Sequence, residues 1–93
     1  MEITKKSDLV ETLSDRMKVT KKTSREFIDS FLEEISKSLS RGERVKLSGF
    51  GVFWTKVFQE KQVLPIGGGS KKKIAARRMP RFSPGAWLKR KVR

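Results

Sequence analysis

The stretch "GERVKLSGFGVFWTKVF", residues 42–58, contains two runs of alternating side chains on either side of a glycine-rich turn. In the first run valine and leucine alternate with arginine and lysine, and a period of two is typical of a half-buried strand. Gly49 and Gly51 permit a tight reversal between the runs. The pattern predicts an antiparallel hairpin with strands at 44–47 and 52–58.

Two amphipathic helices are predicted before this hairpin, at residues 8–17 and 21–40. Apolar residues recur three or four positions apart in both segments, which is the spacing of one face of an α-helix. Ser7 and Thr20 are the expected N-caps, and Gly42 is the expected left-handed residue after the second helix. The short break between the helices predicts an antiparallel helical hairpin whose apolar faces need a further partner.

The chain beyond the β-hairpin contains a long connection, a third extended segment and a terminal helix. We expect the third strand within residues 71–82, with Pro80 at its end or in an edge position. A helix at 84–92 is predicted, with Ser83 as its N-cap and Pro84 as its first residue. The fold class is therefore α+β in one domain. Its predicted parts are a helical hairpin (1–43), a sheet (44–58 and 71–82), an arm (59–70) and a C-terminal helix (83–93).

Basic side chains are concentrated in the second half of the chain. Residues 1–43 contain nine Lys/Arg and nine Asp/Glu, whereas residues 44–93 contain fourteen Lys/Arg and one acid, Glu60. The net charge of +13 therefore arises entirely from the second half. Such an asymmetry indicates a polyanionic partner, which by charge alone is DNA, RNA or an anionic membrane.

Cysteine and histidine are both absent from the chain. The first absence excludes disulfides and thiolate metal sites, and the second removes the commonest general base and neutral metal ligand. The ten carboxylates form no motif with acid–base or metal-binding spacing, so we expect no enzymatic activity, metal or cofactor. The N-terminus lacks a signal-peptide core and no run of about 18 apolar residues exists, which predicts a soluble cytoplasmic protein.

Three parts of the chain together resemble the bacterial histone-like HU and integration host factor (IHF) family. They are "GERVKLSGFGVF" at 42–53, a basic arm with a proline, and "KIAARRMPRFSPGAWLKRKV" at 73–92. The two helices, the G-F-G turn and the F-x-P-G-x-x-L-K ending fit the family's order and spacing over essentially the whole chain. The closing stretch leans toward the IHF side.

The resemblance implies an intertwined dimer whose helical hairpins lie beneath a saddle of strands. One β-ribbon arm from each subunit is expected to enter the minor groove of double-stranded DNA, where a proline near its tip wedges between base pairs and kinks the duplex. Bent, nicked or A·T-rich DNA would be preferred. The resemblance further implies a protein of the bacterial nucleoid that acts as a homodimer or as a heterodimer with a paralogue.

The arm tip departs from the pattern of the family it resembles. That family usually has R-x-G-R-N-P-x-T-G, whereas this chain has "KQVLPIGGG" at 61–69, aligned without a gap. The proline, Pro65, falls one place earlier, and Phe58 and Leu64 stand where arm arginines are common. Two interpretations stay open: a glycine-rich loop or linker, and a flexible ribbon whose apolar tip, residues 64–66, supplies the wedge.

Charge, position and the resemblance give two sets of candidate residues. The cations should contact phosphates rather than read bases, and the apolar stripe of the second helix should share a core with the phenylalanines around the sheet. Base stacking by Trp54 or Trp87 is a weaker hypothesis. The predicted DNA-binding residues are Arg44, Lys46, Lys56, Lys61, Pro65, Lys71, Lys72, Lys73, Arg77 and Arg78. The predicted dimer-core residues are Phe27, Phe31, Leu32, Ile35, Leu39, Phe50, Phe53 and Phe82.

Other functions stay open on the sequence alone. An RNA-binding module of the ribosomal type explains the charge and the α+β pattern equally well, although kinked or nicked duplex should outcompete structured RNA if the arms bend DNA. A subunit of a sequence-selective IHF-like heterodimer is a second alternative. A cationic membrane-surface protein is a third, but it needs basic residues opposite an apolar helix face, and acids match bases along the longest stripe.

Overall fold

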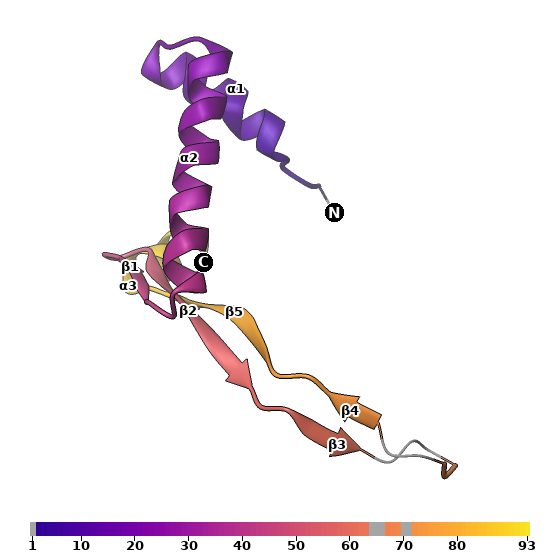
Figure 1. The fold of residues 1–93 in the computed structure, drawn as a ribbon. Helices are drawn as coiled ribbons and strands as arrows, with labels where there is room; N and C mark the ends of the chain where they lie inside the picture. Colours follow the sequence, from indigo (N-terminus) through magenta and orange to yellow (C-terminus); the bar gives the residue numbers. More distant parts are fainter. Residues whose placement is uncertain (1, 64–66, 70–71) are drawn as a thin grey trace. The chain divides into compact units, whose positions relative to one another are not determined.

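The computed structural model describes residues 2–63, 67–69 and 72–93 (Figure 1). The chain forms two compact units, Met1–Lys37 and Ser38–Arg93. Within the described ranges no helix is long and apolar enough to cross a membrane. The elements in chain order are α1 (Lys6–Met17), α2 (Lys21–Ser40), β1 (Val45–Leu47), β2 (Gly51–Phe58), β3 (Lys61–Val63), β4 (Lys72–Ile74), β5 (Arg77–Pro84) and α3 (Ala86–Val92).

The first helix, α1, begins two residues before its predicted start. Lys5 is the N-cap, and its backbone N–H donates to Asp8 Oδ2 at 2.8 Å. Ser7 lies inside the first turn, so the prediction that it caps the helix is wrong. The Asp8 carboxylate at the third helical position satisfies the N–H of Lys5 and lies near the positive end of the helix dipole, which favours the earlier start.

The second helix, α2, has the ends that its sequence predicts. Thr20 Oγ1 accepts the backbone N–H of Thr23 at 3.1 Å, which confirms Thr20 as the N-cap. At the other end Gly42 has a φ of 80°. Its N–H donates to the Leu39 carbonyl at 3.0 Å, and that of Glu43 donates to the Ser38 carbonyl at 3.0 Å. This pair of bonds is a Schellman motif, in which glycine avoids the strain of the left-handed conformation.

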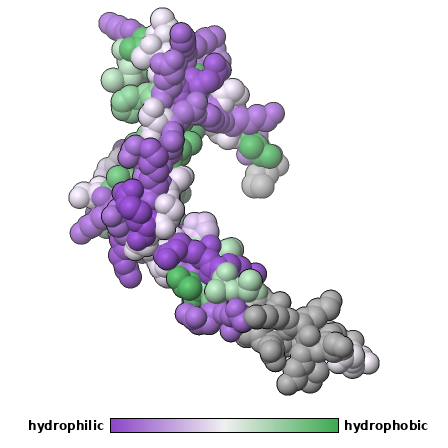
Figure 2. Space-filling view, in the orientation of Figure 1, coloured by the Kyte–Doolittle hydropathy of each residue, from purple (hydrophilic) through white to green (hydrophobic). Residues whose placement is uncertain are grey.

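Small side chains allow α1 and α2 to pack closely. Ser24 Oγ donates to the Val10 carbonyl at 2.8 Å, and an ion pair joins Lys6 of α1 to Asp29 of α2. Among the described residues Val10 is the one fully buried hydrophobic side chain. Much of the remaining apolar surface of the two helices is open to solvent, and Figure 2 shows hydrophobic residues on the surface of this unit.

The strands around the G-F-G turn form the predicted hairpin. β1 pairs antiparallel with β2, with Val45 opposite Phe53 and Leu47 opposite Gly51. The N–H of Phe50 donates to the Leu47 carbonyl at 2.9 Å and closes the turn. β5 pairs antiparallel with the other edge of β2, which gives a three-stranded sheet in the order β1-β2-β5.

The predicted third strand is divided into two. β4 pairs with β3 in a separate two-stranded ribbon, β5 pairs with β2, and residues 75–76 lie between them. Pro80 lies within β5, opposite Thr55, and β5 is an edge strand of the sheet. The edge interpretation of this proline is therefore confirmed, because an edge strand leaves one side of its backbone without a partner.

The terminal helix, α3, begins later than predicted. Ser83 and Pro84 are the last residues of β5, and Gly85 is the N-cap, so the predicted Ser83 cap is wrong. The cause is a pair of contacts with the turn between β1 and β2. The Gly85 N–H donates to the Phe50 carbonyl at 2.8 Å, and the Leu88 N–H donates to the Gly49 carbonyl at 3.2 Å. These bonds hold the chain in the sheet until Gly85.

We predict that Gly85→Ala destabilises the fold. A Cβ atom at this position would lie 2.4 Å from the carbonyl oxygen of Gly49, which is backbone and cannot rotate away. We expect a loss of about 1–3 kcal/mol in the free energy of unfolding, measured by chemical denaturation. Lys89→Ala is the control, because it introduces the same residue at an exposed position of the same helix. Equal unfolding midpoints for Gly85→Ala and the parent would contradict the steric explanation.

Candidate nucleic-acid interface

The antiparallel pairing of β2 and β5 sorts their side chains onto two faces. Phe53 lies opposite Phe82 and Trp54 lies opposite Arg81, and successive residues of a strand point to opposite sides. The phenylalanine face carries Val45, Leu47, Phe53, Thr55, Val57, Arg78, Pro80 and Phe82. The basic face carries Lys46, Val52, Trp54, Lys56, Phe58, Arg77, Met79, Arg81 and Ser83.

The phenylalanine face brings together three of the predicted core residues. The ring centroid of Phe82 lies 4.8 Å from that of Phe53 and 5.7 Å from that of Phe50. Tilted ring pairs at these distances are attractive beyond the area that they bury. Phe82 and Phe50 nevertheless stay 41% and 39% exposed, so a single chain does not cover this face.

Trp54 occupies the middle of the basic face. Its Nε1–H donates to Ser83 Oγ at 3.1 Å, which fixes the indole across the β2–β5 pair. The guanidinium carbon of Arg44 lies 5.7 Å from the centroid of the indole, within the range of a cation–π contact. Arg44 precedes β1, and this contact places its charge with the cations of the basic face.

Phe58 stands at the end of the basic face where the three-stranded sheet stops. The ammonium nitrogen of Lys56 lies 5.3 Å from its ring centroid, and the guanidinium carbon of Arg77 lies 5.2 Å from it. Both cations are exposed to solvent. Two predicted DNA-binding residues are thus held by one aromatic ring.

The charge on this face is positive because its strands contain no acid. β1, β2 and β5 include no Asp or Glu. Glu43, just before β1, accepts hydrogen bonds from Arg41 Nε at 3.2 Å and Nη2 at 3.1 Å. These bonds and the charge of Arg41 hold the pKa of Glu43 below its usual value, so it stays ionised and paired with Arg41. A polyanion approaching the basic face meets cations and aromatic rings.

Arg78 does not join the other predicted DNA-binding residues of the sheet. It lies on the phenylalanine face, where Nη1 donates to Thr55 Oγ1 at 2.9 Å. Its guanidinium also lies beside Gly42, since a Cβ atom at Gly42 would be 3.2 Å from Arg78 Nη1. Arg77 and Arg78 are adjacent in sequence but point to opposite sides of the sheet.

Three other predicted DNA-binding residues, Lys61, Lys72 and Lys73, belong to the β3–β4 ribbon. β3 and β4 pair antiparallel, with Lys61 opposite Ile74, Gln62 opposite Lys73, and Val63 opposite Lys72. Figure 1 shows this ribbon continuing the direction of β2 and β5 away from the sheet. Pro65 and Lys71 lie outside the described residues, as does the predicted apolar tip at 64–66.

Two features of the basic face were absent from the sequence-based candidates. Arg81 lies opposite Trp54 at the centre of the face, and it shares the strand parity of Arg77, which was the signal that could have identified it. The aromatic partners of the cations were also missed, because ring contacts across strands depend on a register that the sequence does not state. No cluster of acids that could hold a metal ion occurs in the part of the chain that the structure describes.

Solved structures with similar folds include HU proteins. An HU–DNA cocrystal structure from Anabaena matches with a TM-score of 0.79 at 31% identity, covering 96% of this chain and 97% of that one. HU from Thermotoga maritima matches with a TM-score of 0.68 at 27% identity, covering 97% of this chain and all of the other. These matches confirm the predicted HU-like fold.

Curated relatives include subunits of integration host factor. The alpha subunit from Buchnera aphidicola subsp. Acyrthosiphon pisum is 41% identical over 87 residues, which are 94% of this chain and 85% of the relative. The alpha subunit from Aliivibrio fischeri is 40% identical over 87 residues, with 94% and 89% covered. The family profile described as "Bacterial DNA-binding protein" matches residues 4–93. The chain therefore belongs to this bacterial DNA-binding family, that of HU and IHF, and is a non-enzymatic, histone-like protein that binds and bends DNA.

Proposed function

We propose that two copies of this chain form one DNA-bending unit, in which the basic faces and the β3–β4 ribbons hold the duplex. The observation that carries the proposal is the sorting of side chains by the β2–β5 register, which gathers Lys46, Lys56, Arg77 and Arg81 on one face. β3 follows β2 in the chain and β4 precedes β5, so the ribbon continues the direction of this strand pair. A duplex that lies along the basic face would therefore also reach the ribbon.

The case for a dimer rests on apolar surface that one chain leaves uncovered. Among the described residues of α1 and α2, Val10 is the one fully buried hydrophobic, while Phe27 is 74% exposed. Phe31 and Leu32 on the same stripe of α2 are 46% and 49% exposed. A core of this size would not stabilise a chain of 93 residues, and a second copy of the same stripe would supply the missing contacts.

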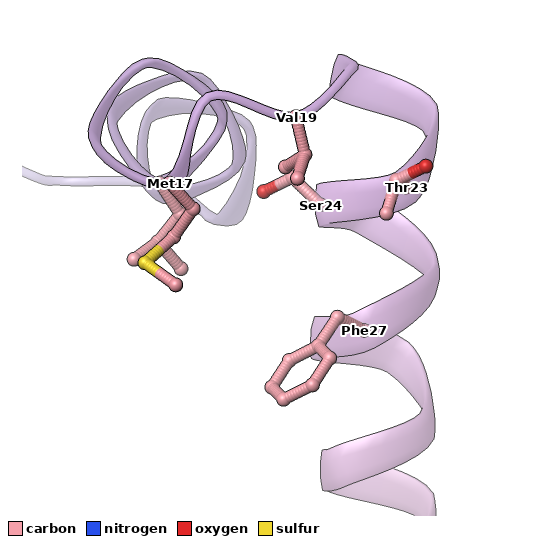
Figure 3. A pocket seen from close by; sticks show the side chains of 6 residues that line it. Met17, Val19, Thr23, Ser24 and Phe27 are labelled. Atoms are coloured by element: carbon pink, nitrogen blue, oxygen red, sulfur yellow. The ribbon is translucent and has the colours of Figure 1, made fainter.

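An open apolar groove between α1 and α2 would form part of the proposed dimer surface. It has a volume of about 370 Å³ and is lined by Leu13, Met17, Val19, Thr23, Ser24 and Phe27. Figure 3 shows Met17 and Phe27 pointing into the space between the two helices. Its lining carries no charge, so a second copy could bury its own apolar stripe there without desolvating an ion.

We predict that Phe27→Asp prevents dimerisation. In a monomer a side chain that is 74% exposed makes few contacts, so its replacement would hardly change stability. In a dimer the new carboxylate would be buried at the interface, which is costly without a partner. We expect sedimentation equilibrium to show a dimer for the parent and a monomeric or unfolded chain for the variant.

Two controls accompany the Phe27 test. Lys22→Asp changes charge on the same helix away from the groove lining and should leave the dimer intact. The unfolding midpoint of the parent should rise with protein concentration, as it does for dimers. If the purified parent chain sediments as a monomer when measured alone, the homodimer hypothesis is contradicted. A heterodimer with a paralogue is then favoured.

The basic face suits phosphate binding with little reading of base sequence. Its cations can neutralise phosphates, and such contacts fix position without carrying sequence information. The chain has no asparagine, and its two glutamines, Gln59 and Gln62, both lie at the start of the arm. Since amide side chains are common readers of base edges, we expect weak sequence preference and a site set by DNA deformability. Such binding suits a protein of the bacterial nucleoid.

We predict that Arg77→Gln, but not Arg78→Gln, flattens the salt dependence of DNA binding. Each lost phosphate contact should reduce the slope of log K against log salt by about 0.9. Arg77 lies on the basic face, whereas Arg78 bonds Thr55 on the other side. Fluorescence anisotropy with a labelled duplex between low and high KCl gives both slopes.

The neighbouring arginines serve as matched controls for one another. They have the same charge and lie next to each other, so nonspecific loss of positive charge would affect both variants alike. Equal flattening by Arg77→Gln and Arg78→Gln would contradict the assignment of the basic face as the DNA-contacting side. An unchanged slope for Arg77→Gln would do the same.

We predict that Pro65→Ala reduces DNA bending more than it reduces affinity. The proline would act as a rigid wedge without an N–H to leave unpaired in the base stack, while the cations elsewhere would keep most of the binding free energy. Energy transfer between dyes at the two ends of a duplex measures the bend, and anisotropy measures affinity. Equal bending by the variant and the parent would show that the wedge lies elsewhere.

A further inference from the structure

Phe58 ends β2 at the point where the sheet gives way to the β3–β4 ribbon. Arg77 is its cross-strand partner, and Lys56 precedes it by two positions on the same face. The two cationic groups lie 5.2 Å and 5.3 Å from the centroid of its ring, and both side chains are exposed. One neutral ring thus holds two like charges at the start of the arm.

We propose that Phe58 is a positioning residue that holds Lys56 and Arg77 in place to bind two phosphates of the DNA backbone. This inference rests on the proposed function, since it concerns how the basic face engages the duplex. Free lysine and arginine side chains lose substantial rotamer entropy when they are fixed against a ligand. A ring that restrains them before binding lowers that cost, and its negative faces offset the repulsion between the two cations.

A core-packing role does not explain the position of Phe58. The phenylalanine cluster of Phe50, Phe53 and Phe82 involves the opposite face of the sheet. Phe58 shares its own face with Lys56, Arg77 and Met79, and is only half-buried there. An aliphatic side chain of similar size would cover the same backbone equally well, but it would have no π system to attract a cation.

The proposed ligand is the phosphodiester backbone at the junction of sheet and arm. A strand of duplex DNA presents phosphates at regular intervals along its axis, so two cations held at a fixed separation can neutralise two of them. Trp54 makes the same kind of cation–π contact with one cation, since Arg44 lies over its ring. The difference is that a hydrogen bond to Ser83 also fixes Trp54, whereas the described contacts of the Phe58 ring are with cations.

The test compares Phe58→Leu with Phe58→Tyr in binding to a nicked duplex. We expect the leucine variant to lose affinity about three- to tenfold, because it lacks both cation–π contacts. The tyrosine variant keeps the ring and should bind within about twofold of the parent. Thermal unfolding of both variants without DNA should match the parent, which separates positioning from folding. The proposal would be overturned if the Phe58→Leu variant bound as tightly as the parent. It would also be overturned if the Phe58→Tyr variant lost as much affinity as the leucine variant.

A double-mutant cycle shows whether Phe58 acts through the two cations. In a chain that already carries Lys56→Gln and Arg77→Gln, the further change Phe58→Leu should have no effect on affinity. If Phe58→Leu still reduced DNA affinity by the same factor in that background, Phe58 would not act through the two cations. The positioning role would then be contradicted, but the assignment of the basic face as the DNA-contacting side would not. If the two glutamine substitutions themselves left affinity and salt slope unchanged, the proposed DNA-contacting face would fail instead.

Discussion

The register between β2 and β5 is the constraint on which the arrangement of functional side chains depends. A shift of β5 by one residue would turn its side chains to the opposite faces, moving Phe82 among the cations and Arg77 and Arg81 onto the apolar side. Gly51 helps to fix the register, because a Cβ there would lie 2.6 Å from both the ring of Phe82 and the carbonyl oxygen of Ser83. Close backbone approach at one end of the sheet thereby determines which charges face the ligand at the other end.

The positive charge of the chain is also separated from its helical half. The first 43 residues carry no net charge, and the remainder carry all thirteen excess positive charges. In the proposed dimer, a neutral helical unit would associate with a second copy through its apolar stripe without bringing a net charge against a like one. The cations are then left for the polyanion, which supplies the counter-charge that the second half of the chain lacks.

The helices, the hairpin and the charged half were predictable because each has a local signal. The periods of 3.6 and two, the Thr20 cap and the Gly42 turn all act within a few residues of sequence. The prediction of Ser83 as an N-cap was wrong because backbone hydrogen bonds to the turn at 49–50 determine where α3 begins. Strand parity could have separated Arg77 from Arg78, which were both predicted to bind DNA. The cation–π contacts, in contrast, required the cross-strand register.

The composition of the arm affects where the binding free energy resides. Residues 59–70 contain one acid and one base, Glu60 and Lys61, so this segment adds no net charge. Bending a duplex costs energy that must be offset by contacts along the wrapped flanks. The cations available for that task are the lysines at 71–73 and those of the basic face. On that face Arg44 contacts the ring of Trp54, and Lys56 and Arg77 contact the ring of Phe58. If the rings hold these cations in place before the duplex binds, as proposed, they lower the entropy cost of the flanking contacts.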